Sequence, residues 1–129
     1  MARILIANDN GDLLEGCRAI LEDDGHVVEI VADGGLAMAR AVTWQPDLII
    51  IDWVMPYVDG PTAIGVLRAQ AATALLPILL MSGTEDAENS AIEIGANGFL
   101  RKPFHAGELR AQVNDLLQAA ASIGSTQPS

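Results

Sequence analysis

Short apolar runs alternate along the chain with longer segments in which apolar residues recur every three or four positions. The runs are residues 3–7, 27–31, 47–51, 77–82 and 98–101. Most of them are apolar throughout, which is typical of strands that are covered on both faces of a parallel sheet. The segments between them have helical spacing, for example at Leu109, Val113 and Leu116. The pattern therefore predicts five βα units.

Residues that favour helix ends lie between the runs and the periodic segments. The expected N-caps are Asp12, Asp33 and Thr84. The pattern as a whole predicts an α/β fold, namely a doubly wound five-stranded parallel sheet. The helical periodicity stops after Ala121. We therefore expect one domain over residues 1–121 and a flexible C-terminal tail over residues 122–129.

Composition narrows the classes of partner. The 129 residues include 17 acids and 7 bases, which gives a formal net charge of −10. Such a charge repels phosphate backbones and anionic membranes, so we expect a protein partner and neither direct nucleic-acid binding nor membrane binding. The chain lacks the organisation of a signal peptide and its apolar runs are too short to span a bilayer, so a cytoplasmic location is expected. Cys17 stands alone in the sequence and is expected to be a small core side chain.

Polar residues follow four of the five expected strands. Asn8 and Asp9 come after the first strand, Asp52 after the third, Ser82 at the end of the fourth and Lys102 after the fifth. The carboxyl ends of parallel strands meet at one edge of the sheet, so we expect these side chains to converge there.

The converging groups suit phosphoryl chemistry. Carboxylates from two strand ends are hard oxygen ligands of the kind that Mg²⁺ prefers, and Lys102 adds a compensating cation. A carboxylate such as Asp52 can form an acyl phosphate if metal and ammonium neutralise the charge on the incoming phosphoryl oxygens. The Ser82 hydroxyl is placed to hydrogen-bond a phosphoryl oxygen, and Gly83 beside it leaves room for the group to enter.

Four motifs in this order resemble the receiver domains of bacterial two-component response regulators, of the single-domain chemotaxis and sporulation type. The motifs are Asn8-Asp9, DWVMPYVDG at residues 52–60, Ser82-Gly83 and Lys102-Pro103-Phe104. The resemblance covers residues 3–120 and implies a flavodoxin-like strand order of 2-1-3-4-5. It also implies a signalling phosphoacceptor domain that catalyses only its own phosphorylation and slow dephosphorylation, and is otherwise no enzyme.

The resemblance assigns roles to the residues at the strand ends. Asp52 would accept a phosphoryl group from a sensor histidine kinase or a histidine phosphotransfer protein. Asp9, Asp52 and the main-chain carbonyl of Val54 would hold Mg²⁺, with Asn8 contributing indirectly, and Lys102 would contact the phosphoryl group.

The resemblance also implies a switch. Ser82 would be the switch hydroxyl, Phe99 would be the switch aromatic, and the Lys102–Pro103 bond would be cis. A downstream target protein would bind a surface formed by the fourth helix, fifth strand and fifth helix, and a homodimer is a further option. This surface comprises residues 85–93, 99–101 and 107–117.

Two positions, Asn8 and Phe99, depart from the family's common pattern. Asn8 replaces an acid, which removes one negative charge from the pocket and predicts weaker Mg²⁺ binding. Phe99 lacks the hydroxyl of the usual tyrosine, so a ring switch would work by packing alone. Val54 and Thr84 flank the expected approach of a hydrolytic water and orient it poorly, which predicts slow self-dephosphorylation.

Other interpretations of the same residues remain open. Asp52 could cap a turn, and Lys102 could be an ordinary surface lysine. The alternative function is a phosphorylation-independent receiver that acts as a protein-interaction module. An aspartate-nucleophile hydrolase would carry a second acid where this chain has Val54. A flavodoxin-like cofactor carrier would need a phosphate cradle that residues 7–16 lack.

Overall fold

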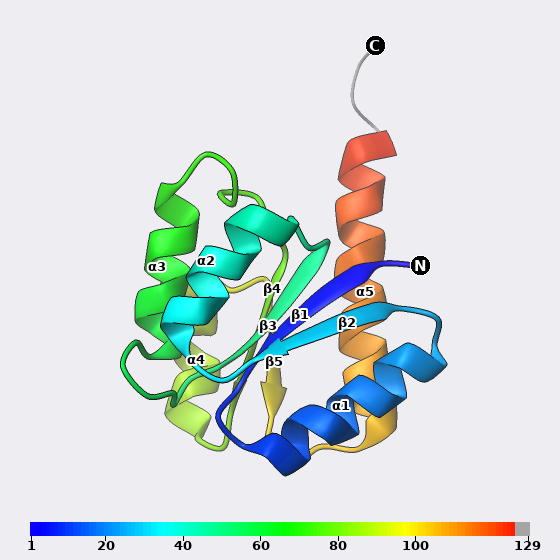
Figure 1. The fold of residues 1–129 in the computed structure, drawn as a ribbon, viewed down its shortest axis with the longest axis horizontal. Coiled ribbons are helices and arrows are strands. Elements are labelled where there is room, and N and C mark those ends of the chain that lie inside the picture. Colours follow the sequence, from blue (N-terminus) through cyan, green and yellow to red (C-terminus); the bar gives the residue numbers. More distant parts are fainter. Residues whose placement is uncertain (126–129) are drawn as a thin grey trace.

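Strands and helices alternate strictly along the part of the chain that the structure describes, residues 1–125 of a computed structural model (Figure 1). The strands are β1 (Arg3–Ala7), β2 (Val27–Val31), β3 (Leu48–Asp52), β4 (Ile78–Ser82) and β5 (Gly98–Arg101). The helices are α1 (Gly11–Asp23), α2 (Gly34–Trp44), α3 (Gly60–Ala69), α4 (Glu85–Ile94) and α5 (Ala106–Ser125).

All strand pairs are parallel, and the sheet has the order β2-β1-β3-β4-β5. The predicted fold class and strand order are therefore confirmed. The direction in which successive strands are added along the sheet reverses between β1 and β3. These two strands pair from Ile4 opposite Leu48 to Ala7 opposite Ile51. Ligands of doubly wound folds bind at such a reversal, beyond the carboxyl ends of the strands.

Helices cover both faces of the sheet, which explains why the strands are apolar throughout. Helices α1 and α5 lie on one face, and α2, α3 and α4 lie on the other (Figure 1). Alternate residues of each strand enter opposite cores, as Ile4 and Ile6 do on the α1/α5 side and Leu5 and Ala7 on the other. Every residue of β3 and β4 is buried, so the centre of the sheet is a rigid platform.

The side chain of Cys17, a residue of α1, lies in the core as expected. Its side chain is 1% exposed, and burial raises the pKa of the thiol to about 11. The thiol is therefore protonated at neutral pH and acts as a small apolar side chain. Among residues 1–125, none of the helices combines the length and the apolar composition that a membrane crossing requires.

One predicted N-cap is wrong. Asp33 and Thr84 cap α2 and α4 as expected, because their side-chain oxygens accept hydrogen bonds from Leu36 and Ala87. Helix α1, however, begins at Gly11 and is capped by Asn10, whose Oδ1 accepts from the Leu13 N–H at 3.2 Å. Asp12 lies inside the first turn, where its charge favours the positive end of the helix dipole.

Two element boundaries differ from the prediction. Strand β3 runs from Leu48 to Asp52, so Asp52 is the last residue of the strand and not the residue after it. Helix α5 continues to Ser125, beyond the boundary expected at residue 121, because Ala119, Ala120 and Ala121 are strong helix formers. Residues 126–129 of the expected tail lie outside the described residues.

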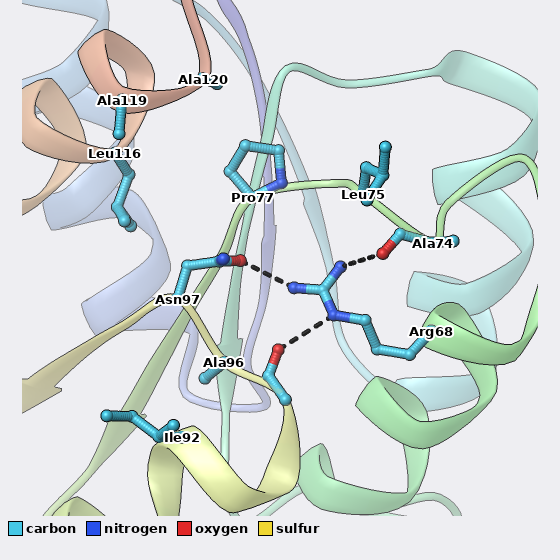
Figure 2. A pocket seen from close by; sticks show the side chains of 11 residues that line it. Arg68, Ala74, Leu75, Pro77, Ile92, Ala96, Asn97, Leu116, Ala119 and Ala120 are labelled. Carbon is cyan, nitrogen blue, oxygen red and sulfur yellow. Dashed lines mark hydrogen bonds between the residues drawn. The ribbon is translucent and has the colours of Figure 1, made fainter. Parts of the chain in front are cut away.

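The amino-terminal edge of the sheet is braced by Arg68 at the end of α3 (Figure 2). Its guanidinium donates to the Gly95 carbonyl at 3.0 Å, to Asn97 Oδ1 at 2.7 Å and to the Leu76 carbonyl at 2.7 Å. Burial lowers the pKa of this guanidinium, yet these acceptors keep it within the fold. Arg68 therefore ties α3 to the segments that precede β4 and β5.

A hollow of about 630 Å³ lies beside this brace, between α4 and α5 (Figure 2). Its described lining is mostly apolar, with Arg68 as the charged group. The hydrogen bonds of Arg68 are directed at protein acceptors, and the hollow lies at the opposite edge of the sheet from Asp52. The polar side chains that were expected to converge therefore lie at the carboxyl edge of the sheet, away from this hollow.

Candidate functional site

The alternation of side chains along the strands decides which way each site residue points. Ile6 and Ile50 lie in the core under α1 and α5. Asn8, the residue after β1, and Asp52, the last residue of β3, each lie two positions beyond these residues. Continuing the β1–β3 register by one residue past Ala7 and Ile51 therefore sets them next to each other on the same side. Neighbouring strands are about 4.8 Å apart, so these two side chains lie side by side.

Ser82 points toward the other side of the sheet. Leu80 belongs to the core beneath α2, α3 and α4, and Ser82 continues that row. Phe99 is opposite Leu80 in the register and packs against the same core with its side chain half-buried. Two groups of site residues thus meet at the carboxyl edge from the two faces of the sheet.

Asp52 is a buried carboxylate with a cationic partner. The residue is 2% exposed, and its Oδ2 accepts a hydrogen bond from Lys102 Nζ at 2.8 Å. Its Oδ1 accepts a long hydrogen bond of 3.3 Å from the Val54 N–H. A buried carboxylate without a partner would be costly, and the Lys102 ammonium supplies that partner.

The backbone after β5 carries Lys102 to this position. The Lys102 N–H donates to the Ser82 carbonyl at 2.9 Å, which extends the pairing of β4 and β5 by one residue. The Lys102–Pro103 bond is cis, as the resemblance implied. The Lys102 side chain is 31% exposed and extends from the protein surface to the buried carboxylate.

Ser82 forms a hydroxyl pair that the sequence analysis missed. Ser82 is 5% exposed, and its Oγ lies 3.2 Å from Thr84 Oγ1. The Thr84 N–H also donates to Ser82 Oγ at 3.2 Å, and Thr84 Oγ1 in turn accepts from Ala87 as the N-cap of α4. The hydroxyl at the strand end is therefore linked directly to the first turn of α4. The Ser-Gly-Thr spacing is the signal that could have predicted this pair.

Asn8 is fully buried and only partly satisfied. Its Oδ1 accepts from the Asn10 N–H at 2.8 Å, and its N–H donates to the Val31 carbonyl at 3.1 Å. Its Nδ2 is buried and has no hydrogen-bond partner among residues 1–125. Leaving such a donor unpaired costs about 1–3 kcal/mol.

The oxygen donors at this edge fit Mg²⁺, which binds through one or two carboxylates and keeps several waters. Asp9 lies just after β1 with an exposed side chain, and Asp52 is the last residue of the neighbouring strand β3. Residues 1–125 hold no group of three or more His, Cys, Asp or Glu side chains that could bind a metal. The Asn8 oxygen is already engaged by Asn10, so Asp9 and Asp52 are the acidic groups available there.

The loop after β3 is packed tightly beneath Asp52. The Gly60 N–H donates to the Trp53 carbonyl at 2.8 Å, and a Cβ on Gly60 would lie 2.9 Å from Trp53 Cα and closer still to the Asp52 carbonyl oxygen. Met55 is buried, whereas Val54 is 69% exposed at the rim. Tyr57 has a positive φ of 68° and is almost fully exposed, a loop conformation that the sequence analysis missed.

The chain matches the family model of the response regulator receiver domain over residues 4–114. It is 33% identical to the alkaline phosphatase synthesis transcriptional regulatory protein SphR of Synechococcus elongatus, over 98% of this chain and 53% of that protein. The chain therefore spans about half the length of this curated relative.

Solved structures agree with the family model. The chemotaxis response regulator CheY4 of Vibrio cholerae superposes with a TM-score of 0.85 at 30% identity, covering 90% of this chain and 98% of that one. The receiver domain of the sensor histidine kinase PA1611 from Pseudomonas aeruginosa PAO1, which has a magnesium ion coordinated in its active site cleft, gives 0.85 at 28% identity over 91% of this chain and 98% of that one. With the strand order, the family match and these likenesses together, the chain belongs to the response regulator receiver domains of two-component systems.

Proposed function

We propose that this receiver domain accepts a phosphoryl group on Asp52. The observation that carries the proposal is the 2.8 Å contact between Lys102 Nζ and the buried Asp52 carboxylate, at the edge where doubly wound sheets bind ligands. The donor would be a sensor histidine kinase or a histidine phosphotransfer protein, consistent with the two-component family.

The transfer needs a nucleophile and a stabilised phosphoryl group. An Asp52 oxygen forms the new bond to phosphorus while the bond from phosphorus to the donor's imidazole nitrogen breaks, with the electron pair remaining on that nitrogen. Lys102 moves its hydrogen bond from the carboxylate to a phosphoryl oxygen, because the carboxylate has lost its charge and the phosphoryl group has brought one.

Asp9, Asp52 and the Val54 carbonyl are the groups that would hold Mg²⁺ in this pocket. The bound ion would supply positive charge against the phosphoryl oxygens. This chain's residues fix where that charge lies: Asp52 is locked at the end of a buried strand, and Asp9 extends from the neighbouring one.

The output is a shift between two arrangements of the surface formed by α4, β5 and α5. Ser82 donates its hydroxyl to a phosphoryl oxygen, which reorients it relative to Thr84 and so disturbs the first turn of α4. Phe99 packs on the same side of the sheet and follows by repacking, because it has no hydroxyl to form a new hydrogen bond. A downstream protein would bind the altered surface.

Intact mass after incubation with acetyl phosphate and Mg²⁺ tests the proposal. We expect a gain of roughly 80 Da in the parent protein and none in Asp52→Asn. Retention of the adduct by Asp52→Asn would place the phosphoryl group elsewhere. Absence of any adduct would favour the alternative, a phosphorylation-independent module, while turnover of small phosphate esters would indicate a hydrolase.

A further inference from the structure

The orientation of the Asn8 amide is fixed by its surroundings. An N–H can donate only to the oxygen of an amide, and the Asn10 N–H lies 2.8 Å from Asn8 Oδ1. The NH₂ group must therefore occupy the other position, where it is buried without an acceptor. A donor thus stands at a point of the pocket where a carboxylate would present a charged oxygen.

This donor lies inside the protein. Asn8 is 0% exposed, so groups of the protein surround Nδ2 and are the nearest acceptors to consider. The β1–β3 register, continued by one residue beyond Ala7 and Ile51, brings Asp52 beside Asn8 on the side of Ile6 and Ile50. In the present arrangement Lys102 holds Asp52 by Oδ2, and Oδ1 is held only by the long 3.3 Å bond from Val54.

We propose that Asn8 is a positioning residue that lowers the divalent-cation requirement for phosphorylation of Asp52, an inference that rests on the proposed function. When one Asp52 oxygen takes the phosphoryl group, Lys102 moves its hydrogen bond to that group. The Asp52 side chain is then free to rotate. The oxygen that remains a carbonyl then accepts a hydrogen bond from Asn8 Nδ2. The unpaired donor is satisfied in the phosphorylated state and not in the free state, so Asn8 favours phosphorylation.

Charge acts in the same direction. An acid at position 8 would add a second buried negative charge beside Asp52, and this charge would repel an incoming phosphoryl group until a cation neutralised it. The neutral amide adds no such repulsion. Asn8 therefore weakens cation binding and at the same time makes the cation less necessary.

The test compares the parent protein with Asn8→Asp, which keeps the side-chain size and the acceptor for Asn10. Phosphorylation by acetyl phosphate is followed by intact mass in EDTA and in saturating MgCl₂, and for each protein the rate in MgCl₂ is divided by the rate in EDTA. We expect this ratio to be about tenfold smaller in the parent protein, the effect of one hydrogen bond together with one removed charge. Equal ratios would overturn the inference.

A second measurement does not depend on the variant folding. In ¹⁵N-labelled parent protein, we expect the Asn8 side-chain NH₂ resonances, assigned after mutation or by backbone correlation, to shift downfield on phosphorylation with acetyl phosphate and Mg²⁺. The NH₂ of Gln45, at the C-terminal end of α2 and outside the surface formed by α4, β5 and α5, is the control and should not move. Unmoved Asn8 signals in a fully phosphorylated sample would overturn the inference and leave the proposed function standing. A failure of the parent protein to label even in MgCl₂ would overturn the proposed function, and the inference with it.

Discussion

Individual side chains at the carboxyl edge set how the pocket treats a cation. Asn8 is buried and carries no charge, so Asp9 and Asp52 are the acidic groups that would face a bound ion. An added carboxylate at position 8 would strengthen the attraction for a divalent cation while destabilising the empty pocket.

We therefore predict that Asn8→Asp binds Mg²⁺ more tightly than the parent protein, by about tenfold or more. Titration with MgCl₂, followed by the fluorescence of Trp53 in the loop after Asp52, measures the two affinities. The Trp44→Phe background removes the other tryptophan and should leave the affinity unchanged. Equal affinities in the two proteins would show that position 8 does not contribute to the metal site.

The proposed phosphorylation gives Val54 an expected effect on the lifetime of the phosphorylated state. Its side chain is 69% exposed at the rim and cannot orient water. We predict that Val54→Asn speeds loss of the phosphoryl group by roughly tenfold, because a positioned amide can hold a water for attack. Val54→Ala is the control for altered access and should have a much smaller effect. Decay is followed by intact mass after removal of acetyl phosphate, and an unchanged rate in Val54→Asn would contradict this role.

The elements themselves follow closely from the pattern of apolar residues. Three of the five strands have the predicted bounds, and the other two differ by one residue, because continuous apolar runs between turn residues define buried strands well. The predicted start of α1 was wrong because Asn10 and Asp12 are both good capping residues and lie two positions apart. Only the three-dimensional path of the chain after β1 decides between them.

The start of α3 is an element boundary with a direct effect on the site. Gly60 packs against the backbone of Trp53 and Asp52, where no side chain can be accommodated. We predict that Gly60→Ala lowers the free energy of unfolding by about 2–3 kcal/mol and slows phosphorylation, because the Asp52 backbone must shift. Gly65→Ala in the same helix is the matched control. Its position is open, so it should be neutral or stabilising by up to about 1 kcal/mol. Equal denaturation midpoints for the two variants would refute this account of the α3 boundary.

At the scale of the whole molecule, the sequence located the strand ends but not the side-chain arrangement around them. Asp52 and Lys102 were expected to meet, and they lie 2.8 Å apart even though 50 residues separate them. The Ser82–Thr84 pair and the unpaired Asn8 donor were not predicted, because each depends on the rotation of a side chain within the folded edge. Strand topology fixes which residues are neighbours, whereas hydrogen-bond partners require coordinates.

The central claim is that the converging strand ends make Asp52 the phosphoacceptor, and the most direct measurement locates the modification. The protein is treated with acetyl phosphate and MgCl₂, then reduced with borohydride, which converts an aspartyl phosphate to homoserine, and mapped by peptide mass spectrometry. We expect homoserine at position 52 and unmodified aspartate at Asp9 and Asp59. Homoserine at another position, with Asp52 intact, would contradict it.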